Sequence, residues 1–304
     1  MKSLKGAIYC FIAALFWGVA FVAQDVSTEL VEPFTFTAVR MTLGGATIAL
    51  LLLFRSLANR RKKDKQEPPQ KTSVPMLLIG GIVCGLCMTV ATVTQQIGLQ
   101  YTTAGKSGFI TACYIILVPI FGLFLKRKCP FFVWISLVLA IVGLYFLCMK
   151  GGFSGFGKGD LITLGCSVAF AVHILVIDYF VRRVDGMALA CLQCFVCALA
   201  AAACMLVTEH PVWDNLLKAW LPVLYTGIFS AGLAYMFQIL GQKNLNPTVA
   251  SIVMSLESVV SVVAAWIILK QAMSAREVIG CVILFAAIIL AQLPQKKKEI
   301  KVLY

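Results

Sequence analysis

The chain has 304 residues, of which 61% are apolar and only 13% are charged, and it carries a formal net charge of +13. Soluble globular domains are about 45–50% apolar and about a quarter charged, so this composition excludes an ordinary water-soluble fold and indicates a protein whose solvent is the lipid bilayer. The excess of Lys and Arg does not indicate nucleic-acid binding, because these residues lie between apolar runs, where they orient helices in a membrane.

Ten apolar runs are long enough to be membrane-spanning helices, since about 20 helical residues cross the ~30 Å hydrocarbon layer at ~1.5 Å per residue. They cover 6–23, 34–54, 74–95, 103–125, 131–149, 160–181, 187–208, 219–240, 248–269 and 275–293. The first run resembles a signal peptide that would be cleaved after Ala23. Phe21 would then occupy the −3 position, where signal peptides have a small residue. Because 6–25 also matches 159–178, deep in the chain, we expect the first run to be a retained helix.

One five-helix pattern occurs twice. The stretch 103–128, opened by small residues and closed by cations, has the hydropathy profile of 247–272, and Lys126 recurs as Lys270. An odd number of helices per copy turns the second copy over in the membrane, as in many secondary transporters. We therefore predict an all-α membrane protein with ten transmembrane helices in two inverted five-helix repeats. The predicted parts are a first repeat at 6–149, a Gly-rich external linker at 150–159, a second repeat at 160–293 and a basic cytoplasmic tail at 294–304.

Basic residues set the predicted orientation. Alternate connections are rich in Lys and Arg, and the positive-inside rule places such connections in the cytoplasm. The basic segments lie at 2–5, 55–71, 126–128, 182–183, 243 and 296–301. We predict a multi-pass protein of the cytoplasmic membrane with both termini in the cytoplasm. The segment 25–32, acidic and without Lys or Arg, fits an external loop.

Ionisable residues inside spans cost about 2.5–3.5 kcal/mol on insertion scales, so each one is a candidate for function. Glu257, near the middle of the ninth run, could carry a coupling proton or receive a cationic group; it could equally pack against Ser and Thr or pair with Lys106. Arg40 could bind an anionic group such as a carboxylate, or extend to the outer headgroups. His173 could relay protons, although a lone His on an apolar helix is more often a packing residue.

Other polar and sulfur side chains have both functional and packing interpretations. Tyr114 could donate a hydrogen bond to a substrate or to another helix, and Asp178 is expected to pair with Arg182 four residues later. The same two interpretations apply to Gln95, Gln96, Gln193 and Gln238. The C-x-x-C pairs at 84–87 and 191–194 are interpreted as packing residues, because each lies within one span. Gly44, Gly45, Gly80, Gly81 and Gly85 are interpreted as close-packing positions.

Neither a cofactor nor a metal is predicted. The stretch 152–159 comes one residue short of a phosphate-binding loop, because Gly159 stands where that loop needs a hydroxyl for magnesium. No soluble strand and helix surround it, so we interpret it as a hinge between the two halves.

Short motifs along the whole chain are typical of one transporter family. They are F-W-G at 16–18, a Pro seven residues before Arg40, G-L-x-x-T-x-A at 98–104 followed by F-I-T-A-C-Y-I-I-L-V-P, G-D at 159–160 and L-E-S at 256–258. Over 6–292 the chain resembles the EamA-type branch of the drug/metabolite transporter superfamily. The resemblance implies ten helices around a central cavity, with Lys106, Tyr114, His173 and Glu257 near it. Ser258 stands where the family often has Pro, so no proline kink is expected there.

The expected function is secondary transport of small metabolites, such as amino acids or related amphipathic solutes, across the cytoplasmic membrane by alternating access. The partners would be a small-molecule substrate and the lipid bilayer, with no nucleic acid, and a homodimer stays open. No enzymatic activity is expected. Two alternatives stay open: a membrane-embedded thiol or redox enzyme that uses the Cys pairs or His173 with Asp178, and a membrane scaffold that transports nothing.

Overall fold

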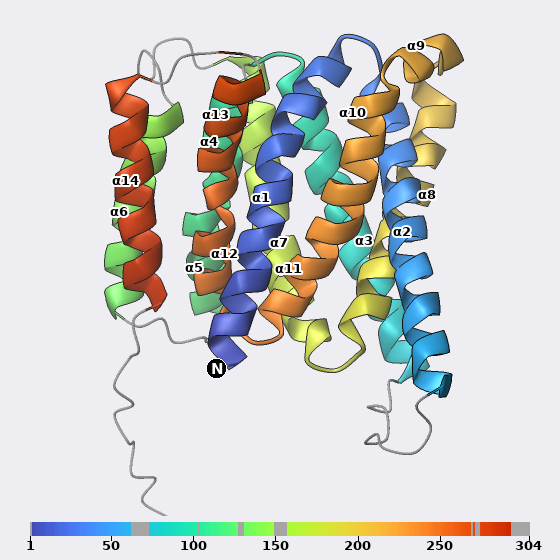
Figure 1. Ribbon diagram of the computed structural model, residues 1–304, viewed down its shortest axis with the longest axis horizontal. Helices are drawn as coiled ribbons and strands as arrows, with labels where there is room; N and C mark the ends of the chain where they lie inside the picture. The colour runs from blue at the N-terminus through green and yellow to red at the C-terminus, as the bar shows by residue number, and fades with distance from the viewer. Residues whose placement is uncertain are drawn as a thin grey trace, which may run out of the picture.

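The computed structural model describes residues 2–61, 73–102, 104–126, 131–148, 157–268, 270 and 274–292. Within these ranges every regular element is a helix, and the helices stand side by side along one common direction (Figure 1). The predicted all-α membrane class is therefore confirmed. The predicted basic tail and most of the predicted Gly-rich linker lie outside the described residues.

The helices follow one another with short connections. The first part of the chain forms α1 (Lys2–Thr28), α2 (Pro33–Arg61), α3 (Val74–Leu99), α4 (Ala104–Ala112), α5 (Tyr114–Phe124) and α6 (Phe131–Cys148). The second part forms α7 (Lys158–Val181), α8 (Gly186–Thr208), α9 (Trp213–Lys218), α10 (Trp220–Tyr225), the π-helix η1 (Thr226–Ala234), α11 (Tyr235–Gln242), α12 (Pro247–Met254), α13 (Leu256–Ile268) and α14 (Ala275–Gln292).

Among the residues that the structure describes, eight helical stretches are long and apolar enough to cross a membrane. Five of them are the single helices α1, α2, α3, α7 and α8, and three are composite: α4 with α5, α10 with η1 and α11, and α12 with α13. A shorter apolar helix covers 131–146 in α6, which packs along α14 at one side of the bundle (Figure 1). Eight clear spans agree with a polytopic membrane fold, and the count of ten stays a prediction.

Two of the predicted spans are not continuous helices. The run predicted at 103–125 is interrupted at Cys113, and the run predicted at 248–269 is interrupted at Ser255. At each interruption the side chain bonds to a backbone carbonyl of the preceding turn: Cys113 Sγ lies 3.5 Å from Phe109 O, and Ser255 Oγ lies 2.7 Å from Ile252 O. Side chains that bond back to the helix in this way often bend it, although Thr42 and Thr47 make the same bond within the continuous α2. The ninth span is interrupted at Ser255, and no proline stands at or next to the interruption.

Small residues allow the helices to approach closely. A Cβ atom on Gly81 would lie 2.3 Å from Leu192 of α8, and one on Gly44 would lie 2.7 Å from Ala231 of η1. Similar crowding surrounds Gly45, Gly80 and Gly85, so the predicted close-packing role of these glycines is confirmed. Helix association in lipid depends on such packing, because lipid tails are as apolar as the side chains.

Helices α2 and α8 pack against each other and are joined at the end where α2 begins. Glu209, directly after α8, accepts hydrogen bonds from the backbone amides of Phe34 and Thr35 at 2.8 and 2.7 Å. The Thr35 hydroxyl donates a third bond to the same carboxylate at 2.7 Å. The carboxylate thus accepts hydrogen bonds from amide groups that have no partner within the first turn of α2. Its negative charge also interacts favourably with the positive end of the helix dipole.

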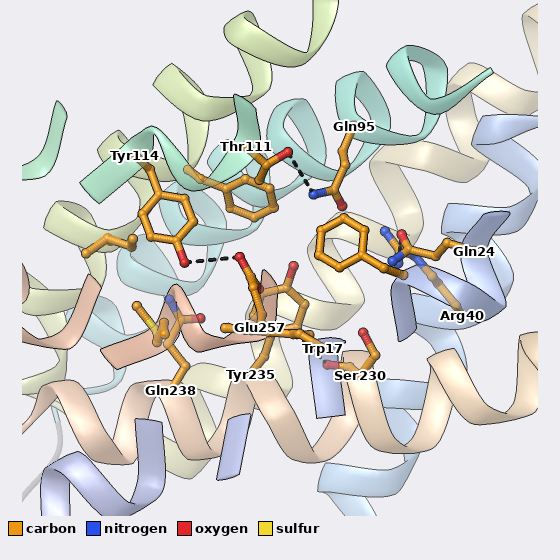
Figure 2. A pocket seen from close by; sticks show the side chains of 14 residues that line it. Trp17, Gln24, Arg40, Gln95, Thr111, Tyr114, Ser230, Tyr235, Gln238 and Glu257 are labelled. Atoms are coloured by element: carbon orange, nitrogen blue, oxygen red, sulfur yellow. Dashed lines mark hydrogen bonds between the residues drawn. The ribbon is translucent and has the colours of Figure 1, made fainter. Parts of the chain in front are cut away.

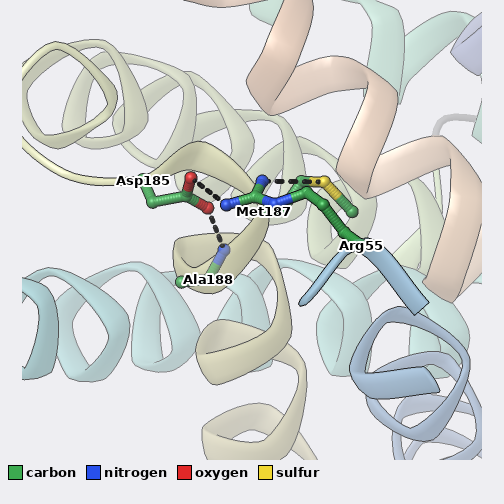
Figure 3. A network of polar contacts seen from close by, with 4 residues as sticks. All are labelled: Arg55, Asp185, Met187 and Ala188. Atoms are coloured by element: carbon green, nitrogen blue, oxygen red, sulfur yellow. Dashed lines mark hydrogen bonds and ion pairs between the residues drawn. The ribbon is translucent and has the colours of Figure 1, made fainter. Parts of the chain in front are cut away.

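The opposite ends of α2 and α8 are joined by an ion pair (Figure 3). Arg55 Nη2 lies 2.7 Å from Asp185 Oδ2, and Arg55 Nη1 lies 3.3 Å from the Met187 sulfur. The other Asp185 oxygen accepts a 3.0 Å bond from the Ala188 amide and so caps the start of α8. Side-chain contacts at both ends therefore hold α2 and α8 in register.

Candidate functional site

One cavity opens between helices of the first and second parts of the chain. The empty space among its side chains, including its opening, amounts to about 480 Å³. It is lined by Trp17, Phe21, Gln24, Arg40, Gln95, Thr111, Tyr114, Phe170, Ile174, Ser230, Tyr235, Gln238, Met254 and Glu257 (Figure 2). Aromatic and aliphatic walls combine with a few polar groups, which is the usual make-up of a small-molecule site.

The acid that lines the cavity is Glu257. It stands at the centre of the 22-residue span Pro247–Ile268, just after the break at Ser255. The Tyr114 hydroxyl donates a 3.1 Å hydrogen bond to Glu257 Oε1, and both residues are buried. Tyr114 itself directly follows the break at Cys113, so the two interrupted spans bring this pair together. Interrupted helices at the membrane midplane are the usual location of substrate and ion sites in secondary transporters.

Two other sequence candidates lie differently with respect to the cavity. His173 is fully buried, does not line the cavity, and has its Nε2 atom 3.2 Å from Gln193 Oε1. Its ring packs near Phe170 and Tyr235, with centroids 6.5 and 6.1 Å apart. The backbone of Lys106 is in α4, but its side chain lies outside the described residues, so the expected alternative of a Lys106–Glu257 pair stays a prediction.

Arg40 and Gln24 form a second polar group in the cavity, away from Glu257 and Tyr114 (Figure 2). Arg40 Nη1 donates a 2.9 Å hydrogen bond to Gln24 Oε1, and the guanidinium lies 5.3 Å from the centre of the Phe36 ring. The Arg40 side chain is 3% exposed, so it lies inside the protein and does not extend to the headgroups as the alternative interpretation supposed. The cavity therefore holds an acid and a base at separate places.

Several lining residues were not named as site candidates from the sequence, among them Trp17, Gln24, Ser230 and Tyr235. The Trp17 indole donates a 3.2 Å bond to the Ser230 carbonyl in the π-helix η1, and its ring packs on Tyr235 with centroids 5.1 Å apart. Ser230 and Tyr235 are polar residues in an apolar span, and sequence pattern does not tell which face of a span points inward. A π-helix is a frequent feature of functional sites, but it has no sequence signature.

Gln95 and Gln238 line the cavity, and Gln96 is buried with neither amide atom hydrogen-bonded, whereas Asp178 and the buried cysteines pack inside the bundle. Asp178 pairs with Arg182 at 2.8 Å, which confirms the predicted ion pair. Cys84, Cys194 and Cys197 are fully buried in one hydrophobic cluster with residues of α2, α3, α8 and α11. Within the described residues no three His, Cys, Asp or Glu side chains lie together as metal ligands would.

Comparison with known proteins decides the family. The model of the EamA-like transporter family matches residues 4–149 and again residues 157–293. The chain belongs to the EamA-like transporter family. The fold also matches a solved structure, titled "Crystal structure of protein", which aligns with a TM-score of 0.77 at 22% identity over 95% of this chain and 96% of that one.

Curated relatives of this EamA-like chain have transporter names. A protein of Archaeoglobus fulgidus named "Uncharacterized transporter" is 27% identical over 96% of this chain and 87% of its own length. The "Uncharacterized transporter YoaV" of Bacillus subtilis is 20% identical over 90% of this chain and 92% of its own length. Family and relatives together support a membrane transporter.

Proposed function

We propose that this chain is a secondary transporter that carries small amphipathic metabolites, such as amino acids, across the cytoplasmic membrane by alternating access. The observation that carries the proposal is the cavity in which Glu257 and Tyr114 meet at two helix breaks. An acid in the middle of an apolar span is costly and usually marks a functional site, and discontinuous helices form the substrate and ion sites of many secondary transporters.

The lining of the same cavity has both the apolar and the polar groups that an amphipathic solute needs. Its apolar wall comes from Phe21, Phe170, Ile174 and Met254, and its polar groups include the Gln95 amide, which donates a 3.4 Å bond to Thr111. A wholly polar solute would leave the apolar wall exposed to water, and a wholly apolar one would leave the polar groups without partners.

Alternating access follows from the proposal that the chain is two inverted repeats. The two copies of the pattern in the sequence, 103–128 and 247–272, are offset by 144 residues. Lys126 and Lys270, separated by the same 144 residues, have φ values of 55° and 54°. Among the described residues they are the two non-glycine positions with positive φ. The shared backbone geometry at this offset supports a common origin for the two halves, which could rock about the cavity between them.

Proton coupling through Glu257 is tested by flux in proteoliposomes. The purified chain would be reconstituted, and uptake of a panel of amino acids would be measured with and without an imposed pH gradient. We expect gradient-driven uptake in the wild type and none above empty liposomes in Glu257→Gln, because the amide cannot carry a proton. Glu29→Gln, the same change at an exposed acid beyond α1, is the matched control and should transport normally. Gradient-driven uptake that survives in Glu257→Gln would refute coupling through this carboxyl.

A further inference from the structure

Arg40 is a buried cation whose hydrogen bonds are incomplete. Its Nη1 atom bonds to Gln24, whereas its Nε and Nη2 atoms are buried and have no hydrogen-bond partner. Buried polar groups in proteins are nearly always paired, and an unpaired one costs the full desolvation of that group. Neutral amides and hydroxyls elsewhere in the bundle are also buried without partners, but Arg40 is charged, so its two unpaired donors carry a larger desolvation cost.

The surroundings of Arg40 supply no counter-charge. Within the described residues no carboxylate forms an ion pair with it, and the titratable side chains close enough to affect it are Tyr235 and Cys197. Neither a phenol nor a thiol is an effective counter-ion at neutral pH, given their ordinary pKa values. Gln24 contributes one neutral acceptor.

The free donors have the geometry of a carboxylate site. Nε and Nη2 lie on one edge of the planar guanidinium, and two parallel N–H groups on such an edge match the two oxygens of a carboxylate. Gln24 occupies the other terminal nitrogen and so fixes the plane of the fork. Arg40 is the single cation among the described cavity-lining residues, which favours a monoanionic carboxylate over a doubly charged phosphate.

We propose that Arg40 and Gln24 form the subsite that binds the carboxylate of the transported solute. This inference rests on the proposed transport function and adds to it a required chemical group. The solute's apolar part would lie along Phe21 and Trp17, which line the cavity from the same helix as Gln24. Glu257 and Tyr114 lie apart from this subsite and do not contribute to it (Figure 2).

The most direct test of the subsite is Gln24→Glu. The new side chain has the shape of Gln24 but carries a carboxylate, which would pair with Arg40 and compete with the carboxylate of the solute. The purified full chain in detergent would be titrated by thermal shift with L-leucine, 4-methylpentanoate and phenylacetate, and with the carboxamide of each at equal ionic strength. In the wild type we expect the carboxylates to stabilise the protein and the amides to have little effect. In Gln24→Glu the apparent affinity for carboxylates should fall about tenfold to hundredfold, the loss expected for a charge-assisted hydrogen-bonded pair.

Two controls separate this loss from a general defect. Gln100→Glu makes the same chemical change at an exposed residue after α3 and should bind as the wild type does. Arg40→Lys keeps the charge but removes the fork, so carboxylate binding should weaken while the protein stays folded.

The proposal is overturned if no carboxylate stabilises the wild type more than its amide, or if Gln24→Glu binds carboxylates as the wild type does. Failure of transport has a different signature. Carboxylate binding through Arg40 without any flux in proteoliposomes would refute the transport proposal and leave the subsite standing. Flux of amines or amides with no preference for carboxylates would refute the carboxylate subsite and leave the transport proposal standing.

Discussion

Glu257 depends on Tyr114 for its one described hydrogen bond, at 3.1 Å. Tyr114→Phe keeps the ring, whose centroid lies 6.4 Å from that of Phe170, and removes only the hydroxyl. We predict that the variant folds normally and that its initial transport rate in proteoliposomes falls about threefold to tenfold, the effect of a hydrogen bond worth about 0.5–1.5 kcal/mol. Tyr114→Phe with the wild-type rate would show that the hydroxyl has no part in transport.

Which single residues the sequence reveals depends on their charge. Glu257 and Arg40 could be predicted as cavity residues, because an ionisable group is costly in an apolar span and usually faces a cavity or a partner inside the bundle. Polar uncharged residues in a span carry no sign of the direction in which they point. Tyr114, Gln95 and Gln238 were therefore predicted with both interpretations open, and all three line the cavity, whereas Gln24 and Tyr235 were not predicted. Lys106 was predicted as an alternative partner of Glu257, and its helix, α4, does contact the helix of Glu257, α13. The hydrogen bond to Glu257 is donated by Tyr114, which follows the break at Cys113.

At the scale of helices, the pairing of α2 with α8 can be tested at Asp185. Burial by itself would raise the pKa of this carboxyl, but the hydrogen bonds from Arg55 and from the Ala188 amide outweigh it and lower the pKa. Asp185→Ala removes both the ion pair and the cap of α8. We expect it to cost about 1–2 kcal/mol of stability, most of it from the cap, because the ion pair is half exposed.

Asp185→Asn separates the two contributions, since an Asn side chain still caps a helix but forms no ion pair. It should lose less than about 1 kcal/mol in a thermal unfolding series in detergent. Because the folded-state pKa is lowered, the wild-type contribution is complete above the ordinary Asp pKa of about 3.9 and disappears as the pH falls through the lower folded value. Equal losses for Asn and Ala at neutral pH would contradict the capping role.

Helix positions were easier to predict than helix interruptions. Hydropathy locates the apolar runs, since each must cross the same layer of lipid. The breaks at Cys113 and Ser255 depend on side-chain bonds to the backbone, and Ser or Cys in a span makes such bonds without always ending the helix. The predicted bounds were also short: α2 extends to Arg61 and α3 to Leu99.

At the scale of the whole molecule, the two interrupted spans run in opposite directions. Figure 1 shows α4 above α5 but α13 above α12, so the chain descends through the first span and ascends through the second. The spans contact each other, α5 with α12 and α4 with α13. This arrangement places the two breaks together and the Glu257–Tyr114 pair between the halves.

The central claim is that two oppositely oriented halves enclose the cavity, and the topology of the chain in a bacterial membrane tests it most directly. Reporters active on only one side of the membrane would be fused after Lys126 and after Lys270, which follow the ends of the two interrupted spans. The account predicts that the Lys126 fusion is cytoplasmic and the Lys270 fusion is external. Both fusions on the same side would contradict the inverted arrangement, and with it the proposed mechanism of transport.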